Sequence, residues 1–79
     1  MTPAQCRAAR ALLDWSQQQL ADAAGVGVVT VRQLEAGSSQ PRRATMDVLR
    51  RALEAAGVQF IDAGDVPEGS GVVLRDRTS

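Results

Sequence analysis

The spacing of apolar residues along this chain changes near Gly57. Before that glycine, apolar positions recur three and four residues apart, which is the pattern of amphipathic helices. The first helix is predicted to begin at Thr2-Pro3-Ala4-Gln5, which places an N-cap threonine before a proline and a glutamine three residues after the cap. We expect one side of this helix to be formed by Cys6, Ala9, Leu12 and Leu13.

The segment from Ser16 to Gly37 predicts two short helices joined by a tight turn. Ser16-Gln17-Gln18-Gln19 repeats the capping pattern. The small Ala21 lies where a second helix has to cross closely. Gly25 is able to adopt the positive φ that reverses the chain after the first of the two helices.

The second helix of this pair, residues 27–36, starts at Gly27, a permissive but weak N-cap. Val31 and Leu34 are three residues apart, so both are expected to point inward and bury one face. An ordinary helical hairpin is the alternative interpretation. A small residue, a glycine and apolar residues at these offsets favour a helix-turn-helix, the unit that places its second helix in the major groove of DNA.

A fourth helix is expected at roughly residues 42–56, ended by Gly57. Val48 and Ala55 widen its apolar arc, which indicates a second contact with the C-terminal segment or with another subunit. Arg50 and Arg51 are interpreted as ordinary surface charges. The core face of this helix is predicted to consist of Met46, Leu49, Ala52, Leu53 and Ala56.

Two short apolar or β-branched runs follow, at 58–61 and 72–74, separated by a Gly-, Pro- and acid-rich loop from Asp62 to Gly71. The predicted fold is therefore mainly α, with four to five helices, a helix-turn-helix and a short C-terminal β-hairpin or strand pair. Residues 1–57 are assigned to the DNA-binding domain, 58–75 to a β segment for dimerisation or packing, and 76–79 to a flexible tail.

Composition argues against most catalytic chemistry. The 79 residues contain no histidine and no tyrosine, and the single Cys6 can form neither an internal disulfide nor a zinc cluster. We expect Cys6 to be a small buried hydrophobe, and the protein to be no enzyme and to use no cofactor or metal. No apolar run approaches the length of a membrane span, so we expect a cytoplasmic protein without a membrane partner.

The net charge is zero, but its distribution is uneven. Residues 1–45 have an excess of arginine, whereas residues 58–79 are acidic. All nine cationic residues are arginines, and the planar guanidinium binds guanine or phosphate through two donors at once. A coding bias toward arginine explains this composition equally well.

On helix 27–36, the arc opposite the buried face is the surface that a recognition helix presents to base edges. Arg32 suits the O6 and N7 of guanine, and Gln33 suits adenine. The valines have only apolar groups to offer to thymine methyls or sugars. A solvated helix face, or a protein interface for the valines, is the alternative. The candidate base-reading residues are Val28, Val29, Arg32 and Gln33.

Phosphate contacts are predicted on either side of this helix. Ser16 and Gln17 lie where free backbone N–H groups and the helix dipole favour an anion, although capping alone explains Ser16. After the helix, a second phosphate clamp is expected from Ser38, Ser39, Gln40, Arg42 and Arg43. Arg10 and Glu35 border the buried faces of their helices, and we hypothesise an ion pair between them.

The motif W-S-Q-x-x-L-A-x-x-A-G-V, followed by T-V-x-x-x-E-x-G, resembles the phage-repressor/Cro-like helix-turn-helix family, also called XRE. The resemblance covers about residues 2–58. It implies a repressor-like domain that binds an inverted-repeat operator as a homodimer, with Gln17 and Thr30 close to the DNA backbone. Gly27 departs from the family, which usually has Ser or Thr there, and valines replace polar residues at the start of the reading helix.

The sequence therefore predicts a sequence-specific transcriptional regulator, a homodimeric repressor whose partner is double-stranded DNA. The alternative is a protein-interaction module, such as an antitoxin or an anti-activator, that uses the same fold to bind another protein. The apolar Val28 and Val29, the wide apolar arc of the fourth helix and the acidic tail favour this alternative.

Overall fold

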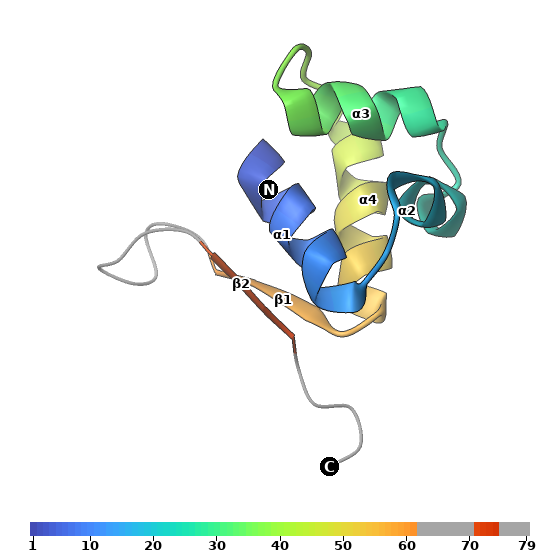
Figure 1. The fold of residues 1–79 in the computed structure, drawn as a ribbon. Helices are drawn as coiled ribbons and strands as arrows, with labels where there is room; N and C mark the ends of the chain where they lie inside the picture. Colours follow the sequence, from blue (N-terminus) through green and yellow to red (C-terminus); the bar gives the residue numbers. More distant parts are fainter. Residues whose placement is uncertain (62–70, 75–79) are drawn as a thin grey trace.

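The computed structural model describes residues 1–61 and 71–74. Four helices precede two antiparallel strands: α1 Pro3–Leu13, α2 Gln17–Ala24, α3 Val28–Ala36, α4 Arg43–Ala55, β1 Val58–Ile61 and β2 Gly71–Leu74. Figure 1 shows α3 at one end of the molecule and the strands at the other, with α4 running between them. The prediction of a mainly α fold with a short C-terminal β-hairpin is confirmed.

The first two helices begin at the predicted caps. The Thr2 hydroxyl accepts the N–H of Gln5 at 3.0 Å, and the Ser16 hydroxyl accepts the N–H of Gln19 at 3.0 Å. Each glutamine side chain accepts the backbone N–H of its cap residue in return, which completes two capping boxes. The start of each helix is thus fixed by its own local sequence.

Boundaries near the C-terminal end differ slightly from the prediction. α4 is one residue shorter at each end, because Arg42 and Ala56 are its cap residues. β2 is one residue longer, because Gly71 pairs with Ile61. The rest of the predicted loop, residues 62–70, lies outside the described residues, as do Arg75 and the predicted tail at 76–79.

Every helix and the first strand contribute to one hydrophobic core. One prediction for its composition is wrong: Leu12 is 42% exposed, because it lies roughly 100° around α1 from the core-packed Leu13. The buried apolar residues are Cys6, Ala9, Leu20, Ala21, Val31, Leu34, Leu49, Leu53, Val58 and Phe60. The hairpin is therefore part of the folded domain rather than an appendage.

Arg50 also differs from its interpretation as an ordinary surface charge. Its Nε atom donates to Glu54 Oε2 at 3.2 Å, and its guanidinium carbon lies 4.9 Å from the centroid of the Phe60 ring. A cation over an aromatic face is attracted by the ring quadrupole. Arg50 consequently covers the buried ring of β1 and fastens the strand to α4.

Gln5 fastens the other strand to α1. Gln5 is 4% exposed, and its side-chain Nε2 atom donates to the carbonyls of Ile61 at 3.1 Å and Gly71 at 3.0 Å. These carbonyls belong to the paired residues at one end of the hairpin. One glutamine thus completes the cap of α1 and holds both strands against it.

We predict that Gln5→Ala lowers the free energy of unfolding by about 1–3 kcal/mol, because two part-buried carbonyls lose their donor. Urea denaturation measures this change. Gln59→Ala is the matched control, since Gln59 is exposed on β1, and its effect should stay below about 0.5 kcal/mol. Equal effects of the two substitutions would show that the contacts of Gln5 add no stability.

Candidate nucleic-acid interface

Backbone hydrogen bonds close the turn between α2 and α3. Gly25 ends α2 with φ of 74°, as predicted. The N–H of Val26 donates to the carbonyl of Ala21 at 3.0 Å. The N–H of Thr30 donates to the carbonyl of Gly27 at 3.1 Å, and the N-cap position of α3 has no side-chain hydrogen bond because Gly27 occupies it. The turn is held without a capping side chain at the start of α3.

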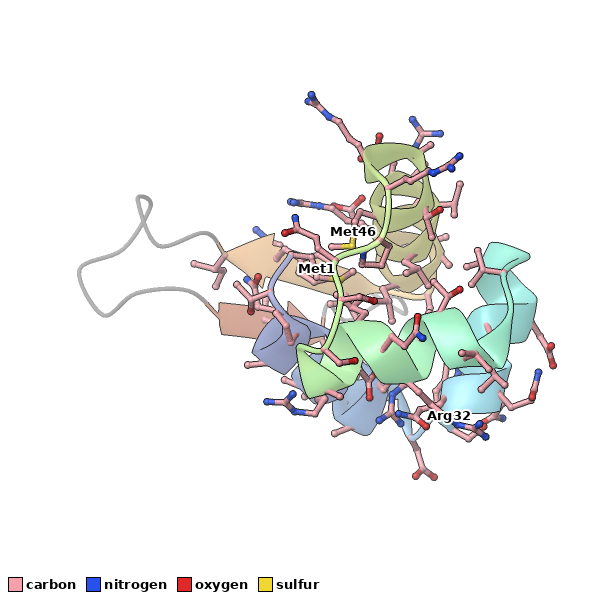
Figure 2. All side chains as sticks on the ribbon, turned by 90° about the horizontal axis from the view of Figure 1, so that it is seen from above. Met1, Arg32 and Met46 are labelled. Carbon is pink, nitrogen blue, oxygen red and sulfur yellow. The ribbon has the colours of Figure 1, made fainter. Side chains whose placement is uncertain are left out.

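α3 has one buried and one exposed face. Val31 and Leu34 are buried in the core, whereas Arg32 and Gln33 are exposed. In Figure 2, Arg32 lies on the side of α3 opposite Met1 and Met46. The two predicted polar base-reading residues therefore lie on an accessible surface.

The two valines at the start of α3 are not equivalent. Val29 is 55% exposed, the largest exposure among the large hydrophobic residues described. Val28 is half-buried and packs against the core. Val29 is therefore the valine that is accessible to another molecule, whereas Val28 helps to pack α3 against the core.

Glu35, at the end of the buried face of α3, is 4% exposed. Its Oε2 accepts from Arg10 Nε at 2.6 Å and from the Cys6 thiol at 3.3 Å. Its Oε1 accepts from Arg10 Nη2 at 2.7 Å and from Gln17 Nε2 at 3.0 Å, and its backbone carbonyl accepts from Arg7. One carboxylate therefore joins α1, α2 and α3.

Arg10 extends this network to the connection between α1 and α2. While two of its guanidinium nitrogens bind the two oxygens of Glu35, Nη1 donates to the carbonyl of Trp15 at 2.9 Å. This two-pronged pairing is stronger and more directional than a single contact between charges. The ion pair hypothesised from the sequence is present in the structure.

The network also shifts the titration of its members. Burial acts to raise the pKa of Glu35, but hydrogen bonds from Arg10, Gln17 and Cys6 outweigh burial and hold that pKa below its usual range. The hydrogen bond to Glu35 raises the pKa of Arg10. Burial, then the hydrogen bond to Glu35, raises the pKa of Cys6 to about 12. At neutral pH the cluster therefore comprises a carboxylate, a guanidinium and a neutral thiol.

Cys6 and Gln17 have functions in this network that sequence reasoning missed. Cys6 is buried as expected, but it is also a hydrogen-bond donor. The side-chain amide of Gln17, expected to contact phosphate, is bonded to Glu35. Position at the start of α2 indicated a DNA contact for Gln17, and no sequence signal indicated its proximity to a carboxylate eighteen residues later.

The other predicted phosphate contacts lie at the surface around α3. At the start of α2, the Ser16 hydroxyl caps the helix. Within α3, Thr30 is half-buried. After α3, the Ser38 hydroxyl donates to the carbonyl of Gln33 at 3.3 Å. The exposed residues on this side are Ser38, Ser39, Gln40, Arg42 and Arg43.

A short helix ending at a left-handed glycine, a tight turn and a second helix with a polar outward face define a helix-turn-helix DNA-binding domain. A helix-turn-helix family model matches residues 7–61, which is more than half of the chain. The protein belongs to this family, the XRE or Cro-like helix-turn-helix DNA-binding proteins. Among curated proteins, no sequence matches the chain.

The described part of the chain lacks both clustered metal ligands and membrane-spanning helices. It contains no group of three or more His, Cys, Asp or Glu side chains placed to hold a metal ion. None of its helices combines the length and the apolar character that crossing a bilayer requires.

We predict that Arg10→Ala lowers the free energy of unfolding by about 3–5 kcal/mol, because the buried carboxylate of Glu35 loses its charged partner. Urea denaturation measures the loss. Arg51→Ala removes an exposed arginine and should change stability by less than about 0.5 kcal/mol. A wild-type unfolding curve for Arg10→Ala would contradict the stabilising role of the ion pair.

The lowered pKa of Glu35 also predicts a pH dependence. A carboxyl group whose pKa is lower in the folded than in the unfolded state adds stability above its unfolded pKa, and this stability is lost as the pH falls through the folded value. Between about pH 5 and pH 2, wild-type protein should therefore lose stability more steeply than Glu35→Gln. Equilibrium denaturation at a series of pH values compares the slopes, and parallel curves would contradict the prediction.

Proposed function

We propose that the protein is a homodimeric transcriptional repressor that reads an inverted-repeat operator by placing α3 in the major groove. The observation that carries this proposal is the outward face of α3, where Arg32 and Gln33 are exposed on a helix whose opposite side is fixed by Glu35. Because that anchoring holds α3 against α1 and α2, the reading side chains are presented in one orientation. Occupation of the operator is the simplest means by which such a dimer regulates transcription.

The chemistry of this face assigns a role to each exposed side chain. Arg32 pairs through two donors with the O6 and N7 of a guanine, and Gln33 pairs with the N6 and N7 of an adenine. The contact of the Ser39 hydroxyl with Gln33 Oε1 is long, at 3.4 Å, so a base readily replaces it. Val29 contributes an apolar contact with a thymine methyl group.

Two flanking segments hold the DNA backbone. After α3, Ser38 and Gln40 lead to Arg42 and Arg43 at the start of α4, and all four are exposed. These residues supply charge-assisted and neutral hydrogen bonds to the phosphates of one DNA strand.

The second phosphate contact lies at the start of α2 and includes Thr30 of the neighbouring α3. Since the Gln17 side chain is bonded to Glu35, we assign the phosphate contact at this position to the free backbone N–H groups of Gln17 and Gln18. The Ser16 hydroxyl keeps its capping bond, and its role is to fix the orientation of these N–H groups.

Dimerisation is assigned to β2. Val73 is 42% and Leu74 48% exposed, and β2 is the second strand of a two-stranded sheet, so one of its backbone edges has no strand partner among the described residues. An exposed apolar strand edge readily pairs with another chain. In Figure 1 the sheet lies away from α3, so pairing through β2 leaves the reading face uncovered.

The proposal is tested by selecting random duplex DNA at two salt concentrations and sequencing the bound pool. Wild-type protein should enrich an inverted repeat whose binding weakens as salt rises. Arg32→Ala should cost about 1–3 kcal/mol of specific binding and relax selectivity at one base position in each half-site. Equal weakening on all sequences would identify Arg32 as a phosphate contact instead.

Arg43→Ala is the matched variant for this experiment, because it removes the same side chain from the phosphate segment. Affinity should fall similarly for all sequences, and the slope of log affinity against log salt should become shallower by about 1. The selected sequence should stay that of the wild type. A changed selected sequence would place Arg43 at a base.

The exposed side chains of β2 give a sharper test of the dimer than removal of the strands. Val58 and Phe60 of β1 belong to the core, so deleting residues 58–79 would damage the fold itself. Leu74→Lys should instead give a folded monomer in sedimentation equilibrium. Leu12→Lys, which changes a similarly exposed leucine on α1, should remain dimeric. An unchanged dimer for Leu74→Lys would exclude β2 as the interface.

The exposure of Val29 favours one competing function, a module that binds another protein through the same helix. The selection experiment separates the two functions. Folded protein that enriches no sequence even at low salt would reject DNA reading and support protein recognition, because a DNA reader binds more tightly as salt is lowered.

A further inference from the structure

A cavity of about 280 Å³ lies on the side of α3 away from Arg32. Its lining comes from three separate segments: the start of the chain, the end of α3 with the loop after it, and the first turns of α4. In Figure 2, Met1 and Met46 lie next to each other beside the segment that connects α3 to α4. The function proposed above uses Gln40 from this lining but assigns no role to the cavity itself.

The lining indicates the chemistry of an occupant. Leu34 is 2% exposed, and Met1 and Met46 pack against the core, so the inner wall is apolar. Ser39 and Gln40 supply polar atoms, and no charged side chain is among the lining residues in the part of the chain that the structure describes. A cation would lose its hydration here without gaining a partner, because the ionised group found on the described lining residues is the α-ammonium of Met1. The site therefore disfavours a cation and suits a molecule with an apolar body and one polar group.

The size of the cavity limits this molecule further. An apolar cavity of about 150 Å³ in another protein holds benzene, so a volume near 280 Å³ accommodates a substituted single ring or a short aliphatic alcohol. Two methionines in the lining suit such a site, because their unbranched, polarisable side chains adapt to the shape of an occupant. Pockets with mostly apolar walls and a few polar groups are typical of small-molecule sites.

We propose that this cavity is an effector site for an uncharged, mostly apolar molecule with one hydroxyl group, of the size of a substituted phenol. The inference rests on the proposed function in one respect, namely that Gln40 contacts a DNA phosphate. Within the described residues the Gln40 amide makes no hydrogen bond, and it lies at the cavity. A ligand hydroxyl that bonds to this amide competes with the phosphate, so occupancy lowers the affinity for DNA. By linkage, DNA lowers the affinity for the ligand by the same factor.

The two methionines, which are the only ones in the chain, provide a direct test of binding. Protein labelled with ¹³C at the methionine methyl groups is titrated with p-cresol in the absence of DNA. Both methyl signals should shift and saturate together. Benzylamine, which is protonated at neutral pH, has a similar ring but a positive charge, and should shift neither. The absence of a saturable shift with p-cresol in folded protein would overturn the site, whatever the protein does with DNA.

A cavity-filling variant locates the binding. Met46→Trp should occupy the space and abolish the p-cresol shift of the Met1 methyl group. Ala44→Trp adds the same ring to an exposed position of α4 outside the cavity, and should leave the titration unchanged. If Met46→Trp does not fold, Leu34→Met, which changes the inner wall at similar volume, should still alter the affinity for p-cresol. An unaltered titration in the folded wall variant would place p-cresol elsewhere.

The coupling to DNA is measured separately on the selected operator. Saturating p-cresol should weaken operator binding by the wild type at least threefold, and Gln40→Ala should reduce this effect to less than 1.5-fold. Binding of p-cresol without any change in operator affinity would overturn the effector role. Failure to bind any DNA would overturn the proposed function, while the methyl titration would still decide whether the site exists.

Discussion

The structure depends on the burial of one charge. The Glu35 carboxylate, taken out of water at the end of α3, is stable there only because α1 and α2 bring donors to both of its oxygens. Apolar contacts among α1, α2 and α3 tolerate small rotations, whereas a carboxylate held by a guanidinium fork does not. The ion pair therefore fixes the orientation of α3 relative to α1 and α2. A fixed orientation of the recognition helix is what reading base edges requires.

Much of the fold was predictable because its signals are local. The capping boxes at Thr2 and Ser16 and the left-handed Gly25 each act within a few residues, so the sequence specifies them directly. The periodic apolar positions of α3 and α4 likewise identified their buried faces. Leu12 was misplaced because an apolar residue at the edge of a helical face is assigned only by what packs against that face.

Contacts between residues far apart in the chain could be predicted from the sequence only in part. The pairing of Arg10 with Glu35 followed from their opposite charges at the borders of two helices. The contacts of Gln5 with Ile61 and Gly71, and of Cys6 with Glu35, join uncharged groups from remote segments, and no spacing in the sequence encodes them. The predicted DNA-contacting residues were expected from their positions on α2, on α3 and in the segment after α3. The structure adds that the side chain of Gln17 is bonded to Glu35, which holds α3 in place.

The two faces of α3 have different roles. The proposed reading positions, Val29, Arg32 and Gln33, form no hydrogen bond or ion pair with the Glu35 network among the described residues, and the positions that hold α3 in place face the other way. Substitutions on the outer face therefore carry little cost in folding stability. If α3 reads DNA as proposed, a few changes on its outer face would alter the preferred sequence while the interior of the domain stayed the same.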